Sequence, residues 1–298
     1  MSDVVEVSEL TKVYGDLKAL DHVSFAIEAD KIYGLLGRNG AGKTTLMRIM
    51  TAQELGASGA VRLFGETPYE NSRALRQTCF VKDNQVYPNN YRLRDTLDQA
   101  ALFFPNWNHA YALSLCEDFH LPLNRRMRKL SRGMLSSAGA IIGLASRAPL
   151  TIFDEPYLGM DAVARSLFYD RLLADYADVP RTIILSTHLI DEVSRLLEHI
   201  LVLDQGRLIL DEEAEALRGR AFAVVGPTAK VDAYTADKET LYRERLGGME
   251  SASVMSDARL EDRQQAEALG LEVTPISLQR LIVYLTSQRI ERKAVGAR

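Results

Sequence analysis

Alternating and continuous apolar runs predict strands in the first part of the chain. Apolar and polar residues alternate over residues 4–28, with a break at Tyr14-Gly15-Asp16, so two strands joined by a turn are expected there. Continuous apolar runs at Ile32–Leu36 and Thr78–Val81 predict buried strands, and the run at Leu46–Met50 predicts the start of a helix.

From about residue 86 to residue 148 the apolar residues recur at helical spacing. Pro105–Asn108 separates two predicted helices, and Asn108 is a candidate N-cap. After this helical insert, strands alternate again with helices, beginning with the strand at Leu150–Phe153 and ending near residue 210. Such alternation favours a mostly parallel sheet covered by helices on both faces.

The pattern changes once more near Leu217–Arg220. We therefore expect a main α/β domain over residues 1–218 and a small α/β appendage over residues 219–298. The tail after Arg289 is expected to be disordered.

Composition narrows the classes of protein to consider. The 298 residues carry a formal net charge of −4 and are 47% hydrophobic, which is typical of a globular protein and not of a nucleic-acid binder. Cys79 and Cys116 are isolated and are expected to be buried thiols in a reducing compartment, and the five His residues show no metal-ligand spacing with them. The N-terminus lacks the features of a signal peptide, and no run reaches the ~18 apolar residues of a membrane span, so a cytoplasmic location is expected.

A phosphate-binding motif follows the strand at Ile32–Leu36. Residues 37–45 (the phosphate loop) read G-x-x-x-x-G-K-T-T between a predicted strand and a predicted helix, the context in which this motif binds nucleoside triphosphates. Its backbone N–H groups would bind phosphate oxygens, Lys43 would reach the β- and γ-phosphates, and the Thr44 hydroxyl would bind Mg²⁺. The candidate nucleotide contacts in this loop are Gly37, Asn39, Gly40, Ala41, Gly42, Lys43, Thr44 and Thr45.

Two acids and a histidine follow later strands. Asp154 and Glu155 come directly after an apolar strand, where open α/β sheets bind ligands. Asp154 would hold Mg²⁺ opposite Thr44, and Glu155 would be the general base for the water that attacks the γ-phosphate. His188 follows the strand at Thr182–Leu185 and would hydrogen-bond the γ-phosphate. The alternative for Asp154 and Glu155 is an acidic turn after a buried strand, and the alternative for His188 is a cap of the helix that follows it.

Leu130-Ser131-Arg132-Gly133-Met134 (the signature stretch) lies between these elements and completes a resemblance. In order and spacing, the chain resembles the ATP-binding subunit of an ATP-binding-cassette (ABC) transporter, of the bacterial single-cassette type. The resemblance covers about residues 4–215. Its matched features are Tyr14, the phosphate loop, the helical insert, the signature stretch, the Asp154-Glu155 pair, the turn at Leu158–Asp161, and His188.

The resemblance implies a P-loop NTPase fold, ATP and Mg²⁺ as cofactors, and ATP hydrolysis coupled to transport, with export as the expected direction. Tyr14 would stack on adenine. Two cassettes, identical or different, would face each other across two ATP molecules. Ser131 and Gly133 would contact the γ-phosphate held by the opposite cassette, and Asp161 would lie in the dimer seam. The helical insert would dock on an integral membrane permease at the cytoplasmic face of the membrane, and no nucleic-acid partner is implied.

The sequence departs from the family at two places. Arg132 and Met134 stand where the signature usually has Gly and Gln, and Arg132 would either pair with phosphate or face solvent. Lys82 stands where the family has a Gln that binds Mg²⁺, and an ammonium group cannot bind a cation. Either Gln85 takes this role through a shifted loop, or Lys82 contacts phosphate directly; our hypothesis is that hydrolysis then depends more heavily on the partner.

Other functions explain fewer of these features. A soluble ABC-type ATPase that acts on a nucleic-acid or ribosome partner is the alternative, although such proteins usually carry paired cassettes, coiled coils or basic arms. A P-loop kinase or a small GTPase would not explain the signature stretch. The appendage is either regulatory or dimer-forming, or it is a stabilising cover.

Overall fold

The chain forms two compact units, each with its own sheet. The computed structural model describes residues 3–55, 57–218, 220–256 and 259–296. One unit comprises Met1–His188 and Leu196–Asp211, and the other comprises Leu189–Arg195 and Glu212–Arg298. The expected boundary was at residues 218 and 219, of which Gly219 lies outside the described residues.

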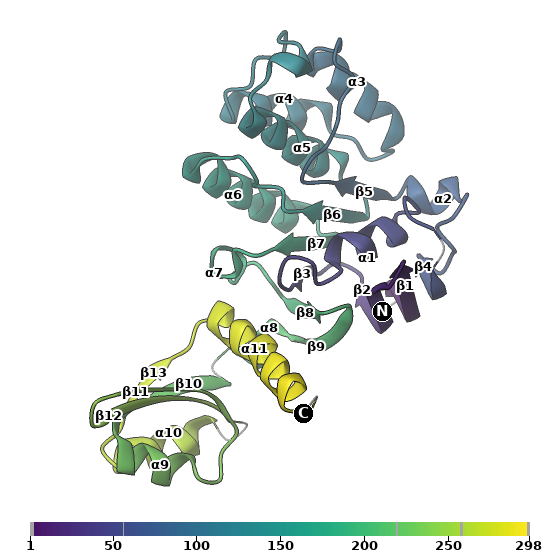
Figure 1. The fold of residues 1–298 in the computed structure, drawn as a ribbon. Helices are drawn as coiled ribbons and strands as arrows, with labels where there is room; N and C mark the ends of the chain where they lie inside the picture. The colour runs from purple at the N-terminus through teal and green to yellow at the C-terminus, as the bar shows by residue number, and fades with distance from the viewer. Residues whose placement is uncertain (1–2, 56, 219, 257–258, 297–298) are drawn as a thin grey trace. The chain divides into compact units, whose positions relative to one another are not determined.

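A six-stranded sheet forms the centre of the first unit (Figure 1). Strands β5, β6, β7, β3 and β8 pair in parallel, which confirms the α/β class expected from the alternating pattern. Every residue of β3 and β6 is buried, as their continuous apolar runs predict. The strands, in sheet order, are β5 (Thr78–Val81), β6 (Leu150–Asp154), β7 (Thr182–Thr187), β3 (Ile32–Leu36), β8 (His199–Asp204) and β9 (Arg207–Glu213).

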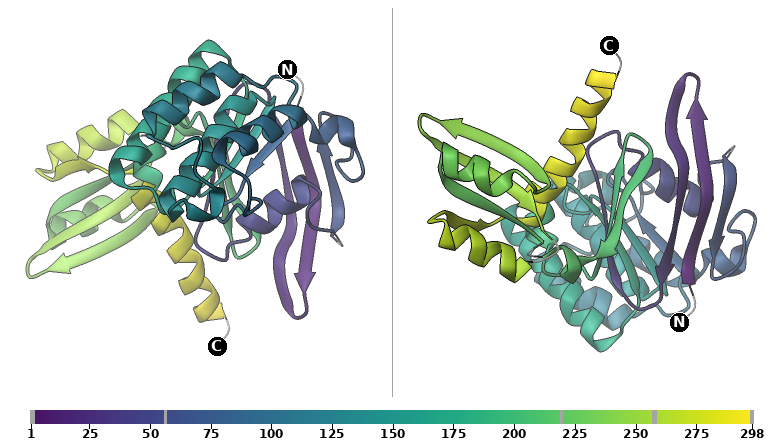
Figure 2. Two further views of the ribbon diagram at one scale, coloured as in Figure 1. Left: turned by 90° about the horizontal axis from the view of Figure 1, so that it is seen from above. Right: turned by 90° about the horizontal axis from the view of Figure 1, so that it is seen from below.

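A second sheet of three antiparallel strands covers helix α1 (Lys43–Met50). Its order is β2-β1-β4, and the long β1–β2 hairpin runs beside β4 in both views of Figure 2. Leu46 and Met47 of α1 are fully buried in one hydrophobic core with residues of both sheets. The bounds are β1 (Asp3–Tyr14), β2 (Leu17–Glu28) and β4 (Ser58–Leu63), followed by the short helix α2 (Ser72–Leu75).

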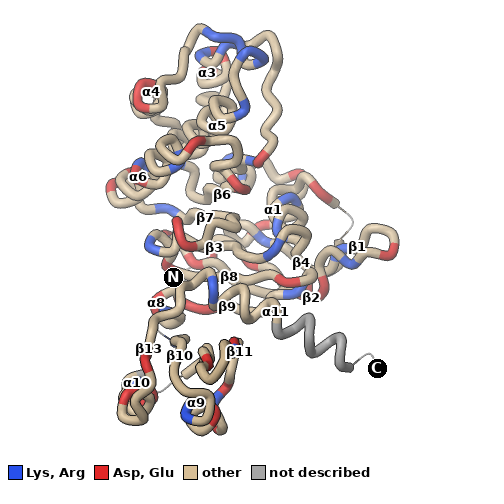
Figure 3. The backbone as a smooth tube through the Cα atoms, turned by 60° about the vertical axis from the view of Figure 1, so that its left-hand side comes forward, with Lys and Arg blue, Asp and Glu red and all other residues tan. Residues whose placement is uncertain are grey.

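Three helices form the expected helical insert, which we call the helical subdomain. They are α3 (Leu93–Phe103), α4 (His109–Asp118) and α5 (Arg132–Ser146), with a 3-10 turn (Met127–Lys129) before α5. Asn108 caps α4 as expected, since its side chain accepts a hydrogen bond from the Tyr111 N–H at 2.9 Å. Lys and Arg gather in the loop before α5, at the top of the tube in Figure 3. The chain then returns to the sheet through β6 and α6 (Ala162–Asp178).

The second unit has a ferredoxin-like core, because its elements follow the order βαββαβ and its four strands pair antiparallel in the order β11-β12-β10-β13. Helices α9 and α10 lie on one face of this sheet (Figure 1). The core elements are β10 (Ala221–Pro227), α9 (Thr228–Thr235), β11 (Thr240–Leu246), β12 (Met249–Met255), α10 (Arg259–Ala268) and β13 (Glu272–Pro275). Three further helices are α7 (Ile190–Val193), α8 (Ala214–Leu217) and α11 (Leu278–Gly296).

The C-terminal region differs from expectation in two respects. The residues after Arg289 were expected to be disordered, but α11 continues to Gly296, which accords with the good helix formers in this stretch; residues 297 and 298 lie outside the described residues. The second unit also takes in Leu189–Arg195, where Asp191 accepts hydrogen bonds from the Ser277 hydroxyl at 3.3 Å and the Gln279 N–H at 3.4 Å. Within the described ranges, no helix has both the length and the apolar character needed to cross a bilayer.

Candidate nucleotide-binding and catalytic site

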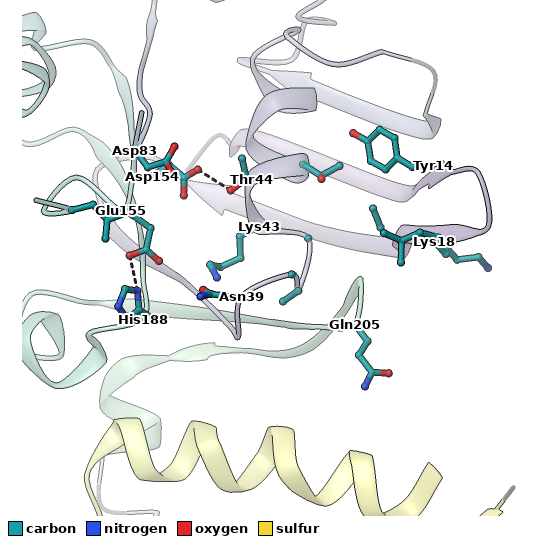
Figure 4. A pocket seen from close by; sticks show the side chains of 17 residues that line it. Tyr14, Lys18, Asn39, Lys43, Thr44, Asp83, Asp154, Glu155, His188 and Gln205 are labelled. Carbon is teal, nitrogen blue, oxygen red and sulfur yellow. Dashed lines mark hydrogen bonds and ion pairs between the residues drawn. The ribbon is translucent and has the colours of Figure 1, made fainter. Parts of the chain in front are cut away.

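A depression of about 860 Å³ brings together most of the residues singled out from the sequence (Figure 4). We call it the phosphate-loop depression. It lies at the carboxyl ends of β3, β6 and β7, as expected for a ligand site in an open α/β sheet. Its lining residues are Tyr14, Leu17, Lys18, Ala19, Asn39, Gly40, Ala41, Gly42, Lys43, Thr44, Thr45, Asp83, Asp154, Glu155, Leu158, His188 and Gln205.

The phosphate loop is tightly packed at two glycines. At Gly42, φ is +108°, and a Cβ atom there would lie 2.5 Å from the Ala19 carbonyl oxygen. At Gly37, a Cβ atom would collide with the Leu203 carbonyl oxygen. Only glycine fits at these positions, because the backbone of neighbouring strands occupies the space of any side chain.

Lys43 is held at the centre of the loop. Its ammonium group donates hydrogen bonds to the Gly37 carbonyl at 2.7 Å and the Arg38 carbonyl at 3.3 Å, and the residue is 6% exposed. Burial lowers the pKa of Lys43, while the charges of Glu155 and Asp154 act in the opposite direction. A buried cation is a suitable partner for phosphate oxygens.

Thr44 and Asp154 form the pair expected for magnesium. The Thr44 hydroxyl donates to Asp154 Oδ2 at 2.9 Å (Figure 4), and Asp154 is 2% exposed. Burial raises the pKa of Asp154, and the Thr44 hydrogen bond opposes this. Two neighbouring oxygen donors fit Mg²⁺, which binds one or two protein groups together with phosphates and water. Among the described residues, no group of three or more His, Cys, Asp and Glu is placed to hold a metal by itself.

Glu155 and His188 come together from the ends of adjacent strands. His188 Nδ1 lies 2.8 Å from Glu155 Oε2 (Figure 4), and the side chains are 47% and 12% exposed, respectively. Glu155 has a φ of +49°, a backbone conformation that costs about 1–3 kcal/mol for a non-glycine residue and that clusters at functional sites. The acidic turn and the histidine thus meet in the same depression as the phosphate loop.

The structure adds residues that the sequence did not single out. Tyr14, which is 41% exposed, lines the depression as expected, but Lys18 and Gln205 line it too. Asp83 also lines it, whereas the expected Lys82 does not: the Lys82 ammonium lies 5.8 Å from the centre of the Phe80 ring and borders a separate cavity. The available signal for Asp83 was its place just beyond the carboxyl end of β5.

Gln85 also lies outside the phosphate-loop depression. It lines two other cavities, and its buried Oε1 has no hydrogen-bond partner within the described part of the chain. Neither of the two residues considered for the position of the family's Gln is therefore part of this depression.

The signature stretch and Asp161 occupy helix N-termini outside the depression. Ser131 caps α5 through the Met134 N–H at 3.2 Å, and Asp161 caps α6 through the Ala164 N–H at 2.8 Å. The backbone at Gly133 approaches Gly159 so closely that a Cβ atom would lie 2.5 Å from the Gly159 carbonyl oxygen. Arg132 is exposed, with its aliphatic stem against Gly159. The residues expected to contact an opposite nucleotide are thus separate from those that line the chain's own depression.

The two cysteines are buried free thiols, as expected. Burial raises the pKa of Cys79 to about 12 and that of Cys116 to about 11. Both therefore stay protonated at neutral pH, which favours a packing role for them.

Comparisons with known proteins identify the family of the chain. A family profile described as ABC transporter matches residues 20–158. The chain is 32% identical over 220 residues to the putative ABC transporter ATP-binding protein AlbC of Bacillus subtilis (strain 168), covering 70% of this chain and 91% of that protein. It is 31% identical over 222 residues to Nod factor export ATP-binding protein I of Rhizobium meliloti, covering 72% of this chain and 66% of that protein.

A solved structure described as the ATP binding subunit of an ABC transporter superposes with a TM-score of 0.64. It is 25% identical and covers 70% of this chain and 90% of the other. The matched profile, the extent of these similarities and the residues gathered at the phosphate loop lead to one assignment: the chain belongs to the ABC transporter ATP-binding protein family.

Proposed function

We propose that this chain hydrolyses ATP and that Glu155 is the general base. The observation that carries the proposal is the contact of 2.8 Å between Glu155 and His188 in the same depression as Lys43 and Thr44. Glu155 would take a proton from a water molecule. The oxygen of this water would attack the γ-phosphorus, and the bond between the γ-phosphorus and the ADP oxygen would break. His188 would hold the carboxylate and lie beside the γ-phosphate.

The phosphate loop would supply most of the binding. Its N–H groups and the N-terminus of α1 would surround the phosphates, and Lys43 would neutralise part of their charge. Thr44 and Asp154 would hold Mg²⁺, which when bound balances the remaining phosphate charge. Tyr14 would stack on the adenine ring at the open end of the depression.

Replacing Glu155 by Gln tests the proposal. This change keeps the size and hydrogen-bonding reach of the side chain but removes the proton acceptor, so turnover should fall by about 10²–10⁴-fold while ATP binding persists. Glu117→Gln, an exposed position on α4, is the matched control and should hydrolyse ATP like the wild type. Normal turnover in Glu155→Gln would refute the assignment of the base.

We further propose that hydrolysis drives a separate membrane permease in an exporter, with the chain bound peripherally at the cytoplasmic face of the membrane. The relative from Rhizobium is named for Nod factor export, which supports this direction. A groove of about 360 Å³ between β5 and α3 supports a docking role, since Phe103 at its rim is 64% exposed. The aromatic residues of this groove are Phe80, Tyr87, Tyr91, Phe103 and Phe104.

Two cassettes, identical or different, would close on ATP. Ser131 and Gly133 at the start of α5 would contact the γ-phosphate of the opposite cassette, because a hydroxyl and a bare N–H at a helix N-terminus suit phosphate. Asp161 would lie in the seam between the cassettes. Loss of the γ-phosphate on hydrolysis removes these contacts, so the pair would reopen.

One observation favours the alternative, an ABC-type ATPase with a nucleic-acid partner. An open depression of about 500 Å³ in the helical subdomain has five cations among its seven lining residues, in the basic region visible at the top of Figure 3. Backbone hydrogen bonds hold its two segments together, from Leu93 to Arg125 at 3.1 Å and from Met127 to Tyr91 at 2.8 Å. The lining residues are Arg92, Pro122, Asn124, Arg125, Arg126, Arg128 and Lys129.

Affinity capture of the tagged chain from detergent-solubilised membranes of its own host separates the two functions. A stoichiometric polytopic membrane protein in the eluate supports the transporter, and a second cassette would show that the dimer is mixed. Capture of ribosomes or DNA-bound proteins without a membrane protein would favour the alternative. A variant with Phe103→Ser should lose the permease but keep its ATPase activity if the groove is the docking site.

A further inference from the structure

Tyr157 is a buried phenol in the turn that follows β6, and it has no role in the mechanism proposed above. It follows Asp154-Glu155-Pro156 directly and is 3% exposed. Its ring meets the His188 imidazole edge-on, with ring centres 5.6 Å apart and an interplanar angle of 62°. A buried phenol hydroxyl requires hydrogen-bond partners, and its partners here are catalytic residues.

The hydroxyl group lies at the centre of a small hydrogen-bond network. It accepts from the Thr187 hydroxyl at 2.9 Å and from the His188 backbone N–H at 3.2 Å. It also donates to Glu155 Oε2 and lies 3.0 Å from His188 Nδ1. A phenol oxygen has two acceptor positions and one proton. Because Thr187 and the His188 N–H fill the acceptor positions, the single proton is available for the Glu155 carboxylate.

The direction of the Tyr157 hydrogen bond also determines how His188 and Glu155 contact each other. The phenol proton goes to Glu155, so the 2.8 Å contact between His188 Nδ1 and Glu155 Oε2 is best made by an Nδ1–H donor. Among the described residues, both side-chain donors to the Glu155 carboxylate therefore reach Oε2, and Oε1 remains as the proton acceptor for water. Burial, and after it the bond to Glu155, raises the pKa of Tyr157 above its ordinary value, so the hydroxyl keeps the proton it donates.

We propose that Tyr157 is a positioning residue for hydrolysis: its hydroxyl fixes the Glu155 carboxylate and the His188 ring relative to each other, so that Oε1 faces the attacking water. The inference rests on the proposed function, in which Glu155 is the general base. Tyr157 joins the ends of two adjacent strands, since Glu155 follows β6 and Thr187 ends β7. A misplaced base lowers the rate of the chemical step without changing nucleotide affinity.

The test is Tyr157→Phe in the full-length chain, which keeps the buried ring and removes only the hydroxyl. We expect kcat to fall by about 10–100-fold, with KM and the affinity for a fluorescent ATP analogue at wild-type values. Tyr33→Phe is the matched control: Tyr33 is 1% exposed, its hydroxyl accepts the Glu28 N–H at 2.9 Å, and it lies outside the site. This control should hydrolyse ATP at the wild-type rate.

A second variant shows whether Tyr157 acts through the base. In a Glu155→Gln background, adding Tyr157→Phe should lower the residual rate no further, because the group being positioned is already lost. A wild-type kcat in Tyr157→Phe would overturn this inference and leave the proposed function intact. A parallel fall in nucleotide affinity, or an equal loss of kcat in Tyr33→Phe, would also overturn it. Full turnover in Glu155→Gln would overturn both the inference and the proposed function.

Discussion

The packing of the phosphate loop can be tested by adding one methyl group at two of its glycines. Gly40 has a φ of +80°, and a Cβ atom there would meet nothing within 4 Å. Gly42 has a φ of +108°, and a Cβ atom there would lie 2.5 Å from the Ala19 carbonyl oxygen and 2.9 Å from Leu20 Cδ2. Gly40→Ala therefore introduces backbone strain alone, whereas Gly42→Ala introduces strain and a collision.

The structure gives a magnitude for each variant. An alanine at positive φ costs about 1–3 kcal/mol of the free energy of unfolding, and both variants carry this cost. The Ala19 carbonyl cannot move away cheaply, because a Cβ atom at Gly206 would lie only 2.8 Å from it, so that oxygen is packed on two sides. Overpacking against rigid backbone costs about 1–3 kcal/mol more in Gly42→Ala. For a unit of this size, that difference lowers the melting temperature by about 2–12 °C relative to Gly40→Ala.

Differential scanning calorimetry is the assay, because it separates the melting transitions of the two units. Only the transition of the unit that contains the phosphate loop should move, and it should move further in Gly42→Ala. Equal melting temperatures for the two variants would show that contact with the Ala19 carbonyl does not dictate glycine at position 42. A shift confined to the C-terminal unit would contradict the placement of the loop.

Two further predictions concern titratable side chains. Lys43→Ala should weaken ATP binding by about 10–150-fold, because a charged donor to phosphate is lost. Lys82→Ala should keep the wild-type affinity, because Lys82 lies outside the phosphate-loop depression. Titration with a fluorescent ATP analogue compares the two variants. Folding raises the pKa of Cys79 from 9.0 to about 12, so its contribution to stability is complete below pH 9 and is lost as the pH rises toward 12. Urea denaturation across this pH range should show a shallower loss of stability in Cys79→Ala than in the wild type, and identical slopes would refute the shift.

The main unit was predictable because its strands are strongly apolar and its site is assembled by topology. Runs such as Ile32–Leu36 and Leu150–Phe153 have the length and apolar character of buried strands, and parallel pairing brings their carboxyl ends to one edge. Once that edge is known, the phosphate loop, Glu155 and His188 must lie near one another. The role expected of each residue follows from the chemistry of its side chain, which the sequence gives directly.

The C-terminal unit was less predictable because its pattern is weak. Strand β11 (Thr240–Leu246) exposes most of its residues, and the apolar residues of helix α9 (Thr228–Thr235) do not gather on one face, so neither gave a clear periodic signal. The ferredoxin-like order depends on which strands pair, and pairing between distant segments is not encoded by local periodicity. The extent of the unit was missed for the same reason, since Asp191 joins it through hydrogen bonds to residues more than 80 positions away.

Within the site, the segment after β5 is where the residue singled out from the sequence differs from the residue that lines the depression. Lys82 and Asp83 follow β5 rather than belong to it, and Asp83 lies in a turn, so the alternation of side chains along a strand does not predict which of them faces the phosphate loop. The resemblance to the family selected position 82, but the structure places Asp83 at the depression and the Lys82 ammonium over Phe80. Tyr157 escaped notice for a related reason: an aromatic residue after an acidic turn has no chemical signature until Thr187 and His188 are seen to occupy its acceptor positions. Motifs thus identify the reacting groups, whereas the groups that orient them emerge only from the three-dimensional contacts.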